Sequence, residues 1–168
     1  MPAVKSASML ESMKNILIAT DGSNGSRAAV AAGLELAETV GAEVTVLYVR
    51  RPIEILGEPF YQRRLSKQLE AARSAVDDAL TAASERGVPA RGEIAEGEPA
   101  KLILELAESR EADLVVVGSR GLGQVSGALL GSVSWAVVRA ANRPVLVIKE
   151  PQSTSVARPA DDEHLHAV

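Results

Sequence analysis

Short apolar runs alternate with longer stretches of helical periodicity along the chain, and this alternation most constrains the fold. The apolar runs lie at residues 14–20, 43–50, 88–95, 113–118 and 144–149. Strands that alternate with helices favour a parallel sheet with helices on both faces, so we expect an α/β fold. The run at 113–118 holds three consecutive valines and is typical of a strand buried on both faces. The run at 88–95 is more polar, which favours the edge of the sheet.

The helices between these runs are marked by their ends. Ser23 or Asn24 is a suitable N-cap for the first helix, and Gly41 ends its periodicity. A long amphipathic helix is predicted from Gln62 to Gly87. Pro99 lies in the first turn of the next helix, where proline is well tolerated.

The run at 113–118 passes into a glycine-rich segment and then into a short helix predicted at 132–141. Glycine can take positive φ and lets the backbone approach a bulky anion closely. The start of a helix adds unpaired amides and the positive end of the macrodipole, so we expect a phosphate site here. Ser132 and Ser134 are candidate hydroxyl donors. The glycines of the segment are Gly118, Gly121, Gly123 and Gly131.

Two other interpretations of the segment stay open. Glycines after a buried strand often only form a tight turn. The spacing Gly121-x-Gly123-x3-Gly127, with Glu150 after the next strand, is a variant of the dinucleotide-binding pattern. In that pattern, however, the glycines join strand and helix directly, whereas about ten residues separate them here. The pattern Gly-x4-Gly-Lys-[Ser/Thr] of the phosphate-loop NTPases is absent.

Composition limits the class of protein. The 168 residues fit one domain, which we place at 13–150, between flexible segments at 1–12 and 151–168. A net charge of −4 without a dense basic run, and only 2% aromatic residues, disfavour nucleic acid and an anionic membrane as partners. There is no cysteine and no apolar run near the ~20 residues of a membrane span, so we expect a cytoplasmic protein.

The spacing Gly118-x2-Gly121-x9-Gly131-Ser132 resembles the motif of the universal stress proteins, specifically their ATP-binding branch. The resemblance covers roughly residues 13–149 and includes the turn at 20–23, the strand end at 47–49 and the closing segment 143–148. It implies a single-domain, doubly wound, open five-stranded parallel sheet of order 3-2-1-4-5, of the adenine nucleotide alpha hydrolase-like kind. In that order the strand sequence reverses between strands 1 and 4, where such sheets bind ligands.

The resemblance also implies the role of each site residue. The main chain of Val49 recognises the adenine edge, Val117 and Gly118 border the ribose, and Thr20 belongs to the turn that carries Asp21. Asp21 faces the ribose or a hydrated Mg²⁺ on the phosphates. Its alternative role is a first-turn carboxylate at a helix dipole. From its place in the glycine segment, and not from the resemblance, Arg120 is expected either to pair with the terminal phosphate or to be solvated. The phosphates are held by Gly121, Gly131, Ser132, Val133 and Ser134.

No catalytic constellation is visible. Hydrolysis needs a base, and both histidines, His164 and His166, lie in the predicted tail. The same two histidines lack a third ligand and make a poor metal site. We therefore expect a regulatory module that binds ATP, with Mg²⁺ held through the phosphates, and that acts on a regulatory protein partner. The alternatives are a slow ATP-hydrolysing enzyme, a cyclic AMP-binding protein, and an interaction protein whose pocket is empty.

The final apolar run predicts an assembly. A terminal strand at a sheet edge exposes unpaired amides and carbonyls, and such an edge is usually covered. The resemblance implies a homodimer in which the final strands, residues 144–149, pair across a two-fold axis. For Trp135, in the last helix, core or interface packing is favoured over base stacking.

Overall fold

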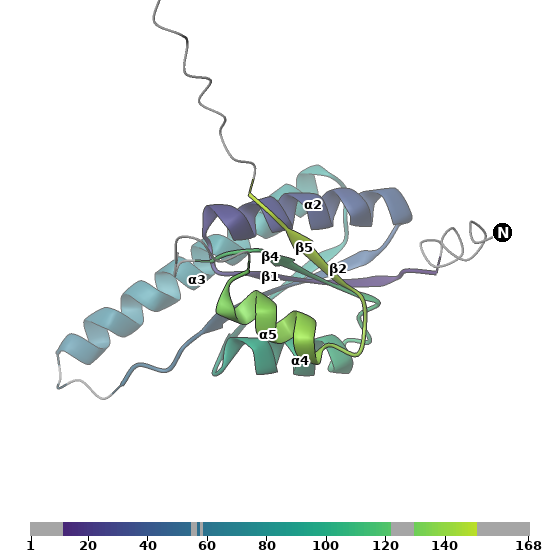
Figure 1. The fold of residues 1–168 in the computed structure, drawn as a ribbon. Coiled ribbons are helices and arrows are strands. Elements are labelled where there is room, and N and C mark those ends of the chain that lie inside the picture. The colour runs from purple at the N-terminus through teal and green to yellow at the C-terminus, as the bar shows by residue number, and fades with distance from the viewer. Residues whose placement is uncertain (1–11, 55–56, 58, 122–129, 151–168) are drawn as a thin grey trace, which may run out of the picture.

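The computed structural model describes residues 12–54, 57, 59–121 and 130–150, in which five strands alternate with four helices (Figure 1). The strands are β1 (Asn15–Thr20), β2 (Glu43–Arg50), β3 (Ala90–Glu96), β4 (Leu114–Gly118) and β5 (Val145–Ile148). The helices are α2 (Asn24–Val40), α3 (Phe60–Glu85), α4 (Pro99–Ser109) and α5 (Ser132–Ala140). The segments predicted to be flexible, 1–12 and 151–168, lie outside the described residues apart from Ser12.

The five strands form one parallel sheet in the order β3-β2-β1-β4-β5, which confirms the predicted order. Helices α2 and α3 cover one face of the sheet, and α4 and α5 cover the other (Figure 1). The polar strand β3 lies at one edge, as predicted, and β5 lies at the other. The order of the strands reverses at β1, whose neighbours are β2 and β4.

The core follows the alternation of side chains along the two central strands. Ile16 and Ile18 of β1 pack in the cluster that α2 covers, whereas Leu17 packs in the cluster that α4 and α5 cover. Every residue of β4 is buried, as its three valines predicted. Complete burial on both faces is typical of a central parallel strand.

The residues predicted to begin and end α2 are confirmed, whereas the residue predicted to begin α3 is not. Ser23 is the N-cap of α2, where its Oγ accepts the N–H of Ser26 at 3.2 Å, and Gly41 ends the helix with φ of +69°. Helix α3 begins at Phe60 rather than at Gln62. Its buried residues all lie between Ala72 and Ala83, so no residue of the helix before Ala72 is buried. This N-terminal part extends beyond the sheet, at the left of Figure 1.

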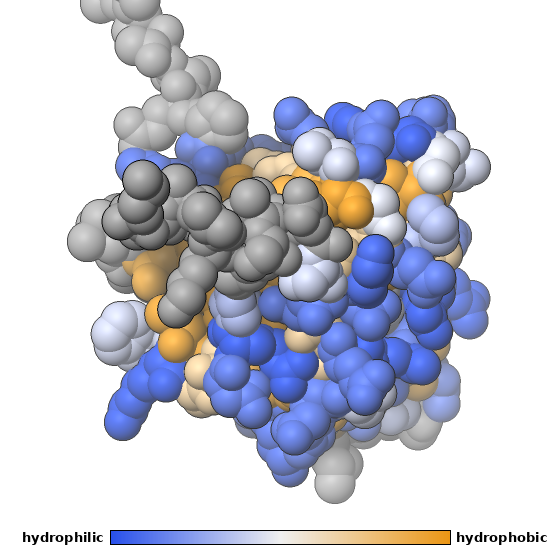
Figure 2. Space-filling view, turned by 90° about the vertical axis from the view of Figure 1, so that its right-hand side faces the viewer, coloured by the Kyte–Doolittle hydropathy of each residue, from blue (hydrophilic) through white to orange (hydrophobic). Residues whose placement is uncertain are grey.

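The end of the molecule from which β1 begins is mainly hydrophilic where it is described (Figure 2). Ion pairs at this end join Arg91 to Glu43 and Arg86 to Glu38, at 3.2 and 2.9 Å. Exposed pairs of this kind contribute little to stability. None of the helices in the described ranges is long and apolar enough to cross a membrane.

Trp135 lies on the outer side of α5 and is 57% exposed. Packing in the core of the protomer, one of the two roles favoured for it, is therefore wrong. Val138, one turn further along the same helix, is also exposed. Packing of Trp135 at an interface stays a prediction.

Candidate functional site

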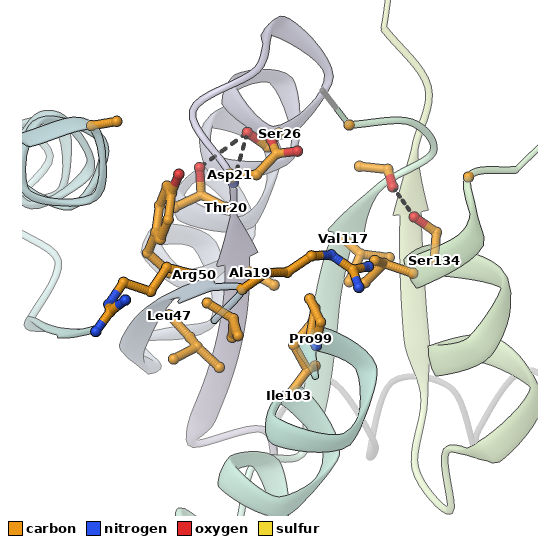
Figure 3. A pocket seen from close by; sticks show the side chains of 18 of the residues that line it. Ala19, Thr20, Asp21, Ser26, Leu47, Arg50, Pro99, Ile103, Val117 and Ser134 are labelled. Carbon is orange, nitrogen blue, oxygen red and sulfur yellow. Dashed lines mark hydrogen bonds between the residues drawn. The ribbon is translucent and has the colours of Figure 1, made fainter. Parts of the chain in front are cut away.

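A pocket of about 610 Å³ lies beyond the carboxyl ends of β1, β2 and β4 (Figure 3). This is the point at which the strand order reverses, and open α/β sheets bind their ligands there. Each residue that the sequence predicted for the site lines this one pocket. They are Thr20, Asp21, Val49, Val117, Gly118, Arg120, Gly121, Gly131, Ser132, Val133 and Ser134.

An apolar surface runs through the middle of the pocket. Ala19 and Leu47 come from the ends of β1 and β2, and Val117 comes from the end of β4. Pro99 and Ile103 of α4 close this surface from below in Figure 3. Apolar walls with a few polar groups at the ends are typical of sites for small molecules and cofactors.

Gly118 ends β4 directly against the first turn of α2. A Cβ atom at Gly118 would lie 2.8 Å from the carbonyl carbon and oxygen of Gly25, so no other residue fits without a shift of the backbone. Gly118, Gly121 and Gly131 do not take the positive φ that glycine allows. At Gly118, close approach between two segments of the chain is the physical reason for glycine.

Two groups at the start of α5 are already bonded within the protein. The N–H of Gly131 donates to the carbonyl of Ser119 at 2.7 Å, which corrects the predicted role of this amide as a phosphate donor. The Oγ of Ser134 donates to the carbonyl of Gly118 at 2.5 Å, so its proton is also used internally. Both bonds tie α5 to the end of β4. Gly123 lies outside the described residues.

The first residues of α5 line the pocket. Ser132, Val133 and Ser134 are the first residues of the helix, and the first intrahelical bond is donated by Trp135 to Gly131 at 2.9 Å. Because the N-cap Gly131 has no side chain to accept a bond, none of these amides is capped by it. A helix start of this kind attracts an anion.

A network of hydroxyls holds the turn after β1. The single proton of Ser26 Oγ is donated to the carbonyl of Ser23 at 3.0 Å. Thr20 Oγ1, at 3.0 Å from Ser26 Oγ, is therefore the donor of their shared bond, and it accepts the N–H of Gly22 at 3.2 Å. Ser26 Oγ also accepts the N–H of Asp21 at 3.3 Å. Thr20 and Ser26 thus position Asp21 and keep their protons within the turn. Ser26 was missed by sequence reasoning.

The Asp21 carboxylate lies before α2 rather than in it. Its Oδ1 accepts the N–H of Ser23 at 3.0 Å, and α2 carries no acidic residue in its first turn, so the first-turn interpretation is not confirmed. Burial raises the pKa of the Tyr48 phenol, and the charge of Asp21 raises this pKa further. The two side chains therefore interact across the ends of β1 and β2.

Basic side chains line the wall of the pocket formed by β2 and α3. Arg50 is the last residue of β2 and Arg51 follows it, while Arg64 and Lys67 lie on α3. Arg50 forms an ion pair with Glu96. None of these four residues was among the site residues predicted from the sequence. The available signal was the spacing of Arg64 and Lys67, which places them on one face of the helix.

The described residues hold no group of three or more histidine, cysteine, aspartate or glutamate side chains that would bind a metal ion. Both histidines lie in the segment 151–168, outside the described part of the chain. Within the pocket, Asp21 is the carboxylate among the lining residues, and the other charged groups there are basic.

An open parallel sheet with a pocket at its switch point and a glycine segment before a helix defines a class of ligand-binding α/β proteins. The model of the universal stress protein family matches residues 13–149, and the chain belongs to this family. A curated relative from Thermus aquaticus, the universal stress protein in the QAH/OAS sulfhydrylase 3′ region, is 38% identical over 138 residues. That match covers 81% of this chain and 98% of the relative.

Two solved structures are similar over nearly their whole length. Protein MJ0577 of Methanocaldococcus jannaschii is 30% identical, with a TM-score of 0.74 and coverage of 84% of this chain and 99% of that one. A universal stress protein solved in complex with cAMP is 25% identical, with a TM-score of 0.66. That match covers 83% of this chain and 99% of the other.

Proposed function

We propose that this protein binds an adenine nucleotide, with ATP as the preferred ligand, and acts as a nucleotide-dependent module of the stress response. The observation that carries the proposal is the start of α5, whose uncapped amides at Ser132, Val133 and Ser134 line the pocket. Backbone amides at a helix start bind phosphate without a lysine. Membership of the universal stress protein family supports the stress-response role.

The ligand is proposed to lie across the apolar surface of the pocket. Its phosphates take the amides of residues 132–134 and of Gly121, and Arg120 lies beside them as a cation. The ribose borders Val117 and Gly118, and the adenine edge meets the main chain of Val49. The donor set fits Mg²⁺ only as a companion of the phosphates, because Asp21 is the carboxylate in the lining.

Binding, rather than turnover, is the proposed activity. Hydrolysis needs a group that takes a proton from water, and Asp21 Oδ1 already accepts the N–H of Ser23. We expect any ATP hydrolysis to be far slower than the ~10 s⁻¹ typical of enzymes. Single-turnover release of phosphate measures it, and a rate near the typical value that Asp21→Asn abolishes contradicts the proposal.

Binding of cyclic AMP is a second candidate function. The observation in its favour is the similarity to the universal stress protein solved with cAMP. A cyclic phosphate carries one charge and no terminal phosphate, so it engages fewer of the α5 amides than ATP does. Mass spectrometry of the nucleotide released from the purified protein distinguishes the two ligands.

The direct test removes one pocket amide without disturbing its helix. Ser132 is the first residue of α5, where proline is favoured, and Gly131 has the extended ψ of 162° that a residue before proline requires. Ser132→Pro is expected to weaken ATP binding about 10-fold or more in calorimetry, as for a lost bond to a charged group. The matched control is Asn24→Pro, which makes the same change at the start of α2, after Ser23 with ψ of 164°.

The control is expected to bind ATP as the native protein does. Equal ATP affinity of Ser132→Pro and Asn24→Pro, both folded by circular dichroism, contradicts the placement of phosphate at α5. Absence of any binding of ATP or cAMP to the native protein contradicts the proposal as a whole.

A further inference from the structure

The pocket is basic although the chain is acidic. The chain carries a net charge of −4, yet among the described residues its pocket is lined by five basic side chains and one carboxylate. The basic residues are Arg50, Arg51, Arg64, Lys67 and Arg120, and the carboxylate is that of Asp21. Clefts lined by one sign of charge concentrate ligands of the opposite sign. The start of α5 explains a phosphate at one end of the pocket and leaves the other basic groups unexplained.

Three of these cations form a group at the other end. Arg51 follows β2, and Arg64 and Lys67 lie one helical turn apart on α3. Within the described ranges, none of the three forms an ion pair, whereas Arg50 is paired with Glu96. We call Arg51, Arg64 and Lys67 the basic wall. Its charges are available to a ligand.

The basic wall and the α5 amides lie at separate ends of the pocket. The ends of β2 and β4 stand on opposite sides of β1, about 10 Å apart at the usual spacing of strands. Helix α3 packs on β2 and β3, while α5 packs on β5 and α4. A ligand that spans the apolar surface can therefore place one anionic group at each site.

A polar group on the same wall also lacks a partner. The Oε1 atom of Gln68, next to Lys67 in the sequence, is buried and accepts no hydrogen bond among the described residues. Buried acceptors without a donor are rare in folded proteins. Because the atom is buried, it meets a donor on a ligand only after the Gln68 side chain turns toward the pocket. The wall thus offers positive charge to an anionic group of a ligand, with an amide side chain beside it.

We propose that the pocket takes a nucleotide with a second phosphate, carried on the 2′ or 3′ oxygen of its ribose, and that the basic wall binds this phosphate. The inference rests on the proposed function, because it places the 5′-phosphate at α5. Arginine and lysine both bind phosphate through charge-assisted hydrogen bonds. Selectivity for such nucleotides then comes from α3, and general nucleotide affinity comes from α5.

The test compares adenosine 5′-monophosphate with adenosine 3′,5′-bisphosphate and adenosine 2′,5′-bisphosphate by calorimetry at one fixed salt concentration. At least one bisphosphate is expected to bind the native protein about 10-fold more tightly than the monophosphate. The better of the two identifies the ribose oxygen that carries the phosphate. Arg64→Ala/Lys67→Ala is expected to lose this gain and to keep its affinity for the monophosphate within about threefold.

Arg63→Ala/Arg73→Ala is the matched control. It removes the same charge from exposed positions of the same helix that do not line the pocket, and it is expected to keep the gain. The inference is overturned if neither bisphosphate binds more tightly than the monophosphate, or if both double variants keep the gain equally. If none of the three nucleotides binds, the proposed function fails with it; if only the gain is missing, the proposed function stands.

Discussion

The carboxylate of Asp21 occupies the space in which a side chain at position 121 would begin. A Cβ atom on Gly121 would lie 2.3 Å from Asp21 Oδ2 and 3.3 Å from its Cγ. Asp21 follows β1 and Gly121 follows β4, so this contact lies at the point where the strand order of the sheet reverses. A side chain at position 121 thus requires the Asp21 carboxylate to move, independently of any phosphate.

This contact predicts a coupling between the two positions. Gly121→Ala forces the Asp21 carboxylate to turn and to lose its bond from the Ser23 N–H, so we expect the free energy of unfolding to fall by about 1–2 kcal/mol. In an Asp21→Ala background the same change is expected to cost almost nothing. Urea unfolding of the four proteins measures the coupling, with Gly57→Ala, which has open space around it, as the control. Equal costs in both backgrounds contradict the contact.

The hydroxyl of Ser26 predicts a second stability effect. Ser26 is 4% exposed, and its Oγ accepts from Asp21 N–H and from Thr20. Ser26→Ala leaves these donors unpaired, and we expect unfolding to become easier by about 1–3 kcal/mol. Ser74→Ala, on the exposed side of α3, is the control and is expected to change the free energy of unfolding by less than about 0.5 kcal/mol. A loss no larger than that of the control shows that the network does not hold the turn.

The Tyr48 phenol predicts a loss of stability in alkali. Burial and the Asp21 charge both raise its pKa, so the unfolded chain releases this proton at a lower pH than the folded protein does. The contribution of the neutral phenol is complete below about pH 10 and is lost as the pH rises through the folded pKa. Urea midpoints measured against pH are expected to fall less steeply above pH 10 in Tyr48→Phe than in the native protein.

Tyr61→Phe is the control for this measurement, because it removes the other of the two tyrosines. Its midpoints are expected to follow those of the native protein. Parallel curves for the native protein and for Tyr48→Phe contradict the direction of the shift.

The edge strand β5 predicts self-association. All four of its residues, Val145 to Ile148, are only partly buried in the protomer, and one side of the strand has no neighbour in the described sheet. We expect a homodimer, and we expect Val145→Asp/Val147→Asp to shift the mass measured by light scattering from dimer to monomer. Circular dichroism checks the fold, and Ile94→Asp, on the opposite edge strand, is the control. A native chain that is monomeric at tens of micromolar contradicts this assembly.

Much of the fold follows from local signals. The strand β2 and the cap residues Ser23 and Gly41 could be placed because apolar runs and capping side chains act over a few residues. The start of α3 could not, since its N-cap Pro59 makes no side-chain bond that would mark it. The exposure of Trp135 was also hidden, because periodicity alone does not tell which side of a short helix meets solvent.

The residues that line the pocket could be predicted from the sequence, but the hydrogen bonds around the pocket could not. Parallel strands bring their carboxyl ends to one edge, so residues 20, 49 and 118 had to meet there. The bond from Gly131 to Ser119 and the contact of Gly118 with the start of α2 depend on how separate segments pack. The basic wall could not be predicted from the sequence. A helical pattern shows which residues share one side of the helix, but it does not show how far the helix extends past the sheet.

The pairing of β1 with β4 limits the order in which the strands of this protein can assemble. Ile16 pairs with Leu114, and the Asp113 carboxylate accepts the N–H of Asn15, 98 residues away in the chain. A chain still emerging from the ribosome can pair β1 with β2, and β2 with β3, but the other edge of β1 stays open until β4 is made. Closing so long a loop is slow. The pocket lies across the junction of β1 and β4, so the nucleotide binding that we propose requires this long-range pairing to have formed.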